Sequence, residues 1–158
     1  MFKNLKKFAK FLLIGSYQAK ILYRIAHFFE NKKLHIFAQI ITRISIVLNS
    51  IEISPKAKLA KSVVISHGLG TVIGQGVTIG DNVWIRQNVT IGQKYSEIDS
   101  LNIYPTIKNN VQIGSGAVIL GDIVVGENVI IGANSVVTKS IPDNCIVAGV
   151  PCKIIRKL

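Results

Sequence analysis

The residue best suited to chemistry in this sequence is His67, one of three histidines. An imidazole accepts a proton near neutral pH, so a histidine beside a bound hydroxyl group can act as a general base. His67 follows the regularly spaced Ile65, whose side chain should point inward, and precedes Gly68, so its own ring can face outward. A histidine merely tolerated on the surface fits the same position, and spacing alone leaves both interpretations open. His27 and His35 lie in a segment of helical spacing, where packing or solvent exposure is expected.

Cys145 and Cys152 are the two cysteines of the chain. They are too few for a disulfide framework and have no histidine close by in sequence, so we expect reduced thiols in a cytoplasmic protein, and no bound metal. The longest uncharged runs fall short of the ~20 apolar residues of a membrane-spanning helix. The start of the chain lacks a convincing signal-peptide cleavage site, so we expect no signal peptide.

The scaffold that must position these groups is a six-residue repeat that begins at Ile53. Aliphatic residues recur in three runs: Ile53, Leu59 and Ile65; Ile73, Ile79, Ile85 and Ile91; Ile107, Ile113, Ile119, Val125, Ile131 and Val137. A period of six fits short strands joined by tight bends, three to a triangular coil, with the aliphatic side chains stacked inside. The sequence therefore predicts a mainly β protein with a β-helix over residues 51–141, followed by a C-terminal turn and tail over 142–158.

The repeat is interrupted twice. Eight residues rather than six separate Ile65 from Ile73, which predicts a two-residue bulge directly after His67. Sixteen residues separate Ile91 from the next repeat position, so a loop at about 93–104 must leave the coil. Such departures are typical of places where a repeat makes room for a site.

Residues 1–50 form a distinct basic segment, with nine Lys and Arg against one Glu. Apolar residues recur at helical spacing with basic residues between them, which predicts amphipathic helices. One interpretation is that the apolar side packs within the oligomer or caps the coil while the lysines meet solvent. Another is that the segment rests on anionic lipid, peripherally at the inner face of a membrane. No nucleic-acid partner is expected, because no recognised binding motif is present.

Three motifs in the coil resemble those of a known family. They are Ile65-Ser-His-Gly-Leu-Gly-Thr-Val-Ile-Gly74, Asn82-Val-Trp-Ile-Arg-Gln-Asn-Val-Thr-Ile-Gly92, and Gly132-Ala-Asn-Ser-Val-Val-Thr-Lys139 with Ala148-Gly-Val-Pro-Cys-Lys153. The chain from Ile53 onward resembles the hexapeptide-repeat acyltransferases, in the branch of serine acetyltransferases and bacterial sugar and polysaccharide O-acetyltransferases. The resemblance implies a left-handed parallel β-helix and a homotrimer, with acetyl-CoA in the groove between subunits and the acceptor hydroxyl near His67.

The resemblance also implies roles for particular residues. His67 would take the proton of the acceptor hydroxyl as its oxygen attacks the thioester, in a direct transfer without an acyl-cysteine intermediate. The residues that would contact acetyl-CoA are Ser115, Gly116, Ala133 and Asn134 beside the pantetheine arm, and Lys139 and Lys153 near the nucleotide phosphates. The candidates for binding the acceptor or orienting His67 are Trp84, Gln87, Glu97, Asp99 and Tyr104, and the family places the loop that carries the last three over the acceptor site.

The group that orients His67 is left open by the sequence. Counting one coil from Ile65 to Ile85 carries position 67 onto Gln87, about 4.8 Å away at the usual distance between strands. Glu97 or Asp99, in the loop that the family places over the acceptor, could take this role instead.

Departures from the serine acetyltransferase pattern favour a different acceptor. That subfamily has Asp before the equivalent of His67 and Arg-His-Pro at the end of the loop, where this chain has Ser66 and Ile103-Tyr104-Pro105. An amino-acid acceptor carries a carboxylate that calls for a bidentate arginine, so the missing Arg predicts a neutral sugar hydroxyl. An exposed Trp84 would pack on a sugar face, although packing in the trimer is equally possible.

We therefore expect an acetyl-CoA-dependent O-acetyltransferase that acts on a sugar, in the biosynthesis of a surface polysaccharide such as a capsule, O-antigen or exopolysaccharide. The alternatives are a serine O-acetyltransferase of cysteine biosynthesis with an altered acceptor site, and a non-catalytic trimeric scaffold.

Overall fold

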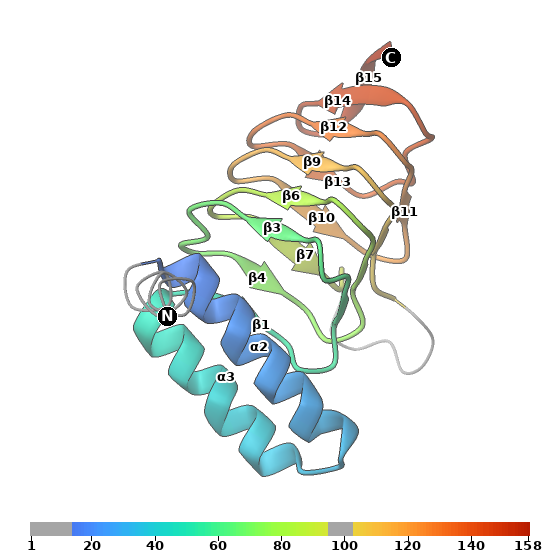
Figure 1. Cartoon of the computed structure of the whole chain (residues 1–158). Helices are drawn as coiled ribbons and strands as arrows, with labels where there is room; N and C mark the ends of the chain where they lie inside the picture. Colours follow the sequence, from blue (N-terminus) through green and yellow to red (C-terminus); the bar gives the residue numbers. More distant parts are fainter. Residues whose placement is uncertain (1–13, 95–102) are drawn as a thin grey trace.

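A parallel β-helix stands on a pair of packed helices (Figure 1). The structure is a computed structural model that describes residues 14–94 and 103–158. The helices α2 (Gly15–Asn31) and α3 (His35–Asn49) come first, and short strands fill the rest of the described chain. The predicted mainly β architecture with an N-terminal helical segment is therefore confirmed.

Within the described residues, three sheets form the sides of the β-helix, and the chain visits them in turn. Sheet A contains β1 (Glu52–Ile53), β4 (Val72–Ile73), β7 (Thr90–Gly92), β10 (Val118–Leu120) and β13 (Val136–Val137). Sheet B contains β2 (Lys58–Leu59), β5 (Thr78–Ile79), β8 (Thr106–Ile107) and β11 (Val124–Val125). Sheet C contains β3 (Val64–Ile65), β6 (Trp84–Ile85), β9 (Gln112–Ile113), β12 (Ile130–Ile131), β14 (Cys145–Ala148) and β15 (Lys153–Lys157).

The repeated aliphatic residues make the core. Each short strand points one side chain outward and the next one inward, because side chains alternate along a strand. Strand pairing places each inward aliphatic residue on the inward aliphatic residue of the next coil, so that Ile73 stacks on Ile91 and Ile85 on Ile113. All four side chains are at most 1% exposed. Burying an aliphatic side chain of this size contributes roughly 1.5–3 kcal/mol, so the six-residue repeat supplies the main driving force for folding.

The C-terminal segment continues the β-helix. Strand β14 pairs in parallel with β12, with Ile131 opposite Val147, and β15 then turns back antiparallel to β14. Residues 142–158, expected as a turn and a tail, thus extend sheet C by two strands.

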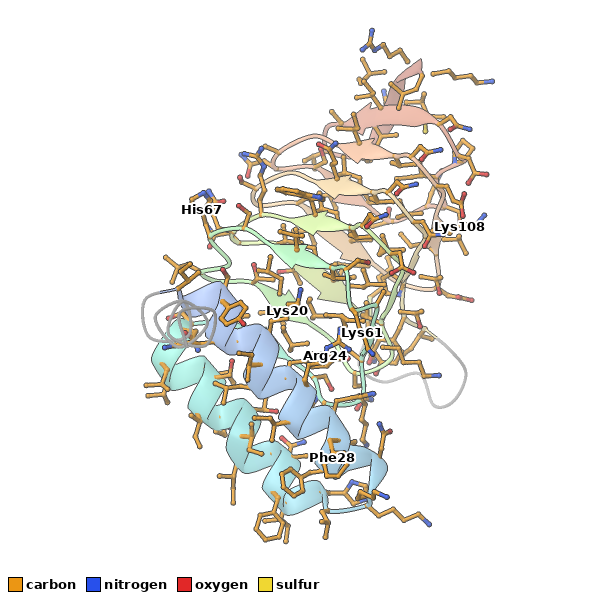
Figure 2. The ribbon with its side chains drawn as sticks, viewed as in Figure 1. Lys20, Arg24, Phe28, Lys61, His67 and Lys108 are labelled. Carbon is orange, nitrogen blue, oxygen red and sulfur yellow. The ribbon has the colours of Figure 1, made fainter. Side chains whose placement is uncertain are left out.

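Helix α2 closes the open end of the β-helix with polar side chains. The first coil has no coil beneath it, and its backbone carbonyls that point away from the next coil need donors from elsewhere. Lys20 donates to the carbonyl oxygen of Val63 at 2.5 Å. The Arg24 guanidinium donates to those of Leu59 and Ala60 at 2.9 and 2.7 Å. Figure 2 shows Lys20 and Arg24 reaching from α2 toward this coil.

This arrangement corrects the interpretation of the basic residues of α2. The basic residues between the apolar positions of residues 1–50 are expected to meet solvent or lipid, yet two of them, Lys20 and Arg24, donate hydrogen bonds to the β-helix. Partial burial, with Arg24 nearby, lowers the pKa of the Lys20 ammonium. Helical periodicity could not reveal this, because the carbonyls that recruit these cations exist only once the coil has formed.

The outer side of α3 carries an exposed apolar surface, which we call the α3 face. It consists of Ile36, Ile40, Ile44, Val47 and Leu48, which are between 43% and 80% exposed. Basic residues lie on and beside α3, at Lys32, Lys33 and Arg43. Among the described helices, none has the length and apolar character required to cross a membrane.

Candidate active site

His67 lies at the corner between sheets C and A, in the predicted two-residue bulge. The backbone N–H of Ser66 still donates to Ile85 at 2.8 Å, as in a regular coil, and Gly70 donates to Ser50 at 2.8 Å. Between these bonds His67 adopts a left-handed conformation, with a φ of 65°. A non-glycine residue in this region is uncommon and is often found at functional sites.

Gly68 turns the histidine outward. Its φ is +62°, and a Cβ atom there would lie 2.5 Å from Cδ1 of Ile51. Any larger residue would therefore displace the core beneath the bulge. Gly68 is buried, whereas His67 is exposed and projects from the edge of the β-helix (Figure 2).

The residue that stacks on Gln87 is Leu69, not His67. The backbone N–H of Asn88 donates to the carbonyl oxygen of Leu69 at 2.8 Å, which aligns Leu69 with Gln87. The expected stacking of His67 directly on Gln87 is therefore wrong. The two extra residues of the bulge lie between Ser66 and Leu69, so the regular pairing with the next coil resumes only at Leu69. Counting backward from the repeat position Ile73, rather than forward from Ile65, would have given the observed register.

The small residues predicted to face the pantetheine arm lie in a column along the same corner. The N–H of Gly116 donates to the carbonyl of Gln87 at 3.0 Å, and that of Asn134 donates to Ser115 at 2.8 Å. Gly116 and Asn134 have φ values of 68° and 54°. A Cβ on Gly116 would lie 2.2 Å from Oδ1 of Asn134, so glycine is required for these coils to stack. We call the stacked positions Leu69, Gln87, Ser115 and Ala133 the corner column.

A cavity of about 280 Å³ opens on sheet C beside the corner column. It brings together Trp84, predicted for the acceptor, with Ser115 and Ala133, predicted for acetyl-CoA. Trp84 is 53% exposed and points outward from β6. Arg86, which was not among the residues predicted for the site, lines the same cavity. The signal was present, because Trp84 and Arg86 flank the inward Ile85 and must share its opposite, outer face.

The two lysines predicted for the nucleotide phosphates line a second cavity, of about 290 Å³, near the C-terminal end of the β-helix. Lys139 and Lys153 are both exposed there, and Cys152 lines the same cavity. Burial raises the pKa of the Cys152 thiol, and burial also raises that of Cys145. Both thiols are thereby kept protonated, which disfavours a nucleophilic role, since the thiolate is the reactive form.

Tyr104 lies at the other edge of sheet A from His67, at the corner with sheet B. Its hydroxyl accepts a hydrogen bond from Nε2 of Gln75 at 2.7 Å and donates one to Oε1 of Gln93 at 3.0 Å. A Cβ on Gly76 would overlap its ring, so the ring packs directly on that turn. Within one chain the structure does not bring Tyr104 to His67.

The two acidic candidates for orienting His67 are Glu97 and Asp99. Both lie outside the described residues.

Comparison with known proteins shows which class of protein this fold resembles. Residues 104–139 match the family model described as bacterial transferase hexapeptide (six repeats). The coils within these residues thus match the hexapeptide-repeat transferases, the family that the motifs resemble.

Two of the similar curated proteins carry the name serine acetyltransferase. A serine acetyltransferase of Synechococcus elongatus is 40% identical over 146 residues, which cover 92% of this chain and 59% of that protein. A serine acetyltransferase of Staphylococcus aureus (strain COL) is 45% identical over 133 residues, covering 84% of this chain and 62% of the relative. The chain therefore spans about three fifths of the length of the curated relatives it matches.

Solved structures agree with this fold. The serine acetyltransferase of Brucella abortus strain S19 in complex with coenzyme A has a TM-score of 0.88 and 36% sequence identity, covering 92% of this chain and 57% of its own. The Neisseria gonorrhoeae enzyme in complex with serine has a TM-score of 0.85 and 30% identity, covering 94% of this chain and 60% of its own. The predicted left-handed β-helix is confirmed by these matches.

The expected sugar acceptor and the expected role in polysaccharide biosynthesis are wrong. The relatives, at about 40% identity over most of the chain, are named for serine. The sugar acceptor was predicted because the loop at 93–104 lacks the Arg that would bind a carboxylate. A missing Arg in one loop does not mean that the whole site lacks a cation. A cation that binds the acceptor can come from another element, and Arg86 lies in the cavity beside Trp84.

Proposed function

We propose that this chain is an acetyl-CoA-dependent serine O-acetyltransferase. The observation that carries the proposal is its 40% identity, over 92% of its length, to a protein named serine acetyltransferase. The site supports it, because the exposed His67 lies in the turn that leads to the corner column. The residue before it, Ser66, is aligned with Arg86, which lines a cavity large enough for a small substrate.

In this proposal His67 is the general base. A neutral imidazole removes the proton of the serine hydroxyl while its oxygen attacks the carbonyl carbon of the thioester. The bond between that carbon and the CoA sulfur then breaks, O-acetylserine forms, and the proton passes to the departing thiolate to give free CoA. No cysteine takes part, which agrees with the raised pKa of both thiols.

Acetyl-CoA is proposed to lie along the corner column. Ser115 and Gly116, which are half-buried, and Ala133 and Asn134, which are exposed, offer small or short side chains to the pantetheine arm. Lys139 and Lys153, further along the β-helix, would attract the phosphates of the nucleotide through charge-assisted hydrogen bonds.

The site is proposed to be completed by a neighbouring copy in a homotrimer. The cavity beside Trp84 opens on the flat outer surface of sheet C, with a large aromatic ring exposed at its rim. A second β-helix packed against this surface would cover the ring and supply the other wall of a groove.

Peripheral contact with a membrane at its inner face is proposed for the α3 face, and not for the basic residues of α2. The α3 face exposes Val47 at 80% and Ile36 at 75%, with cationic Lys32, Lys33 and Arg43 on or near it. Apolar side chains beside basic ones suit the surface of an anionic bilayer.

The experiment that tests the main proposal is a direct product assay. The purified chain is incubated with acetyl-CoA and L-serine, and free CoA and O-acetylserine are measured together. Equal amounts of both products support serine O-acetylation. Release of CoA at the same rate without serine, or no release at all, would overturn it.

A further inference from the structure

Arg86 stands at the candidate active site without a charged partner. Its side chain is exposed, and no ion pair or hydrogen bond joins its guanidinium to another residue within the described parts of the chain. Of the residues that line the cavity beside Trp84, Arg86 alone is charged. A free guanidinium in a site that otherwise offers neutral groups points to an anionic part of a ligand.

The backbone of Arg86 is held from two sides of the histidine bulge. The N–H of Ser66 donates to Ile85 at 2.8 Å, so Ser66, the residue before His67, is aligned with Arg86. Beyond the bulge, the hydroxyl of Thr71 donates to the carbonyl oxygen of Arg86 at 3.2 Å. Arg86 therefore originates one coil away from the turn that presents His67, and adjacent coils are about 4.8 Å apart.

The chemistry of the proposed acceptor supplies the missing partner. Serine carries a carboxylate beside the carbon that bears its hydroxymethyl group. A guanidinium binds a carboxylate through two parallel hydrogen bonds, and this pairing fixes orientation as well as position. Trp84 and Arg86 project from the same face of sheet C, so together they form a wall with one apolar and one cationic part.

We infer that Arg86 binds the carboxylate of the amino-acid acceptor and thereby directs the acceptor hydroxyl toward His67. The inference rests on the proposed function, and it names the group that selects a carboxylate-bearing alcohol over a neutral one. It also explains how the chain can do without an arginine at the end of the 93–104 loop, where Ile103 and Tyr104 stand instead.

The test compares two acceptors in two proteins. L-serine and L-serinamide share the hydroxyl and the amine, but the amide lacks the carboxylate. Arg86→Gln is expected to lower kcat/KM for L-serine by about 10- to 100-fold, the effect of losing a hydrogen bond to a charged group. For L-serinamide the same change should alter kcat/KM by less than about 3-fold. Arg86→Lys keeps the charge but loses the paired N–H donors of the guanidinium. Its kcat/KM for L-serine should therefore lie between those of the parent and of Arg86→Gln.

Two controls separate this assignment from other outcomes. Arg43→Gln removes an exposed arginine of α3 and should leave kcat/KM unchanged for both L-serine and L-serinamide. Thermal unfolding of the Arg86 variants should match that of the parent, because the side chain is exposed. A rise in the KM for acetyl-CoA, with serine unaffected, would show that the anion is a CoA phosphate and would overturn the assignment.

The remaining outcomes are also decisive. Equal losses for L-serine and L-serinamide would likewise refute the carboxylate contact. An unaltered protein that acetylates neither compound would overturn the proposed function, and the Arg86 assignment with it. A parent active on L-serine whose Arg86→Gln variant is equally active would overturn the Arg86 assignment alone.

Discussion

The hydroxyl of Tyr23 donates a hydrogen bond to the carbonyl oxygen of Ala57 at 2.8 Å and accepts one from the backbone N–H of Leu59 at 3.2 Å. One side chain of α2 thus satisfies a donor and an acceptor on the open end of the β-helix. Its pKa is raised, chiefly by burial, so the hydroxyl keeps the proton that it donates. Together with Lys20 and Arg24 it makes α2 the cap on which the first coil is built.

Removing this hydroxyl should destabilise the protein. Tyr23→Phe leaves the ring in place, with Tyr23 only 3% exposed, but strips two backbone groups of their partner. We expect a loss of about 1–3 kcal/mol in the free energy of unfolding, measured in urea. Tyr17→Phe, on the same helix but outside this cap, is the matched control. A change below about 0.3 kcal/mol for Tyr23→Phe would show that water replaces the hydroxyl without cost.

His67 should be essential for turnover and dispensable for folding. Asn tolerates the left-handed backbone that His67 adopts, so His67→Asn removes the base with little strain. Formation of O-acetylserine should fall by about 10²–10⁴-fold, while acetyl-CoA binding measured by calorimetry stays unchanged. His35→Ala removes an exposed histidine on α3 and serves as the control. A His67→Asn variant as fast as the parent would assign proton removal to another group.

Lys153 should contribute to the affinity for acetyl-CoA through charge alone. Lys153→Ala is expected to raise the KM for acetyl-CoA by about 2- to 5-fold at low salt, because an exposed ion pair is worth less than about 1 kcal/mol. The difference should shrink as salt is added. Lys58→Ala removes an exposed lysine from sheet B and should have no effect. Equal KM values for Lys153→Ala and the parent at low salt would place the phosphates elsewhere.

The trimer should be the species that binds acetyl-CoA. Sedimentation of the purified chain is expected to give three times the mass of the 17.3 kDa subunit. Trp84→Glu, at the rim of the cavity on sheet C, should weaken the assembly and acetyl-CoA binding together, because it places a charge where a neighbour is expected. A monomer with full activity would contradict both the trimer and a site shared between copies.

Membrane contact should depend on the α3 face. The parent should float with vesicles of phosphatidylserine and phosphatidylcholine at low salt, and less so at high salt. Val47→Glu should abolish flotation, because it sets a carboxylate in the centre of the apolar surface. Val150→Glu changes a residue of similar exposure, 71%, in the turn between β14 and β15, and should float like the parent. Equal recovery of all three proteins, or none with anionic vesicles, would leave the α3 face without this role.

The sequence by itself determined the core and the position of the catalytic candidate. A repeat of six is incompatible with other regular structures, so the inward side chains from Ile53 to Val137 could be named in advance, and the structure buries them. The eight-residue interval between Ile65 and Ile73 likewise located the bulge at His67. Such features are local, since each depends only on the spacing of neighbouring residues along the chain.

Only the tertiary structure decided which residues meet at the site and at the capped end. The alignment of Leu69 with Gln87 depends on where, between Ile65 and Ile73, the two extra residues leave the regular coil. The spacing alone allows them to lie near either of these two residues. The contacts of Lys20 and Arg24 depend on backbone carbonyls of the first coil that point away from the next coil. The spacing of residues along the chain does not predict these carbonyls. Trp84 and Arg86 share a face through strand alternation alone, but they meet Ser115 and Ala133 only through the stacking of successive coils, which brings residues far apart in sequence to one surface.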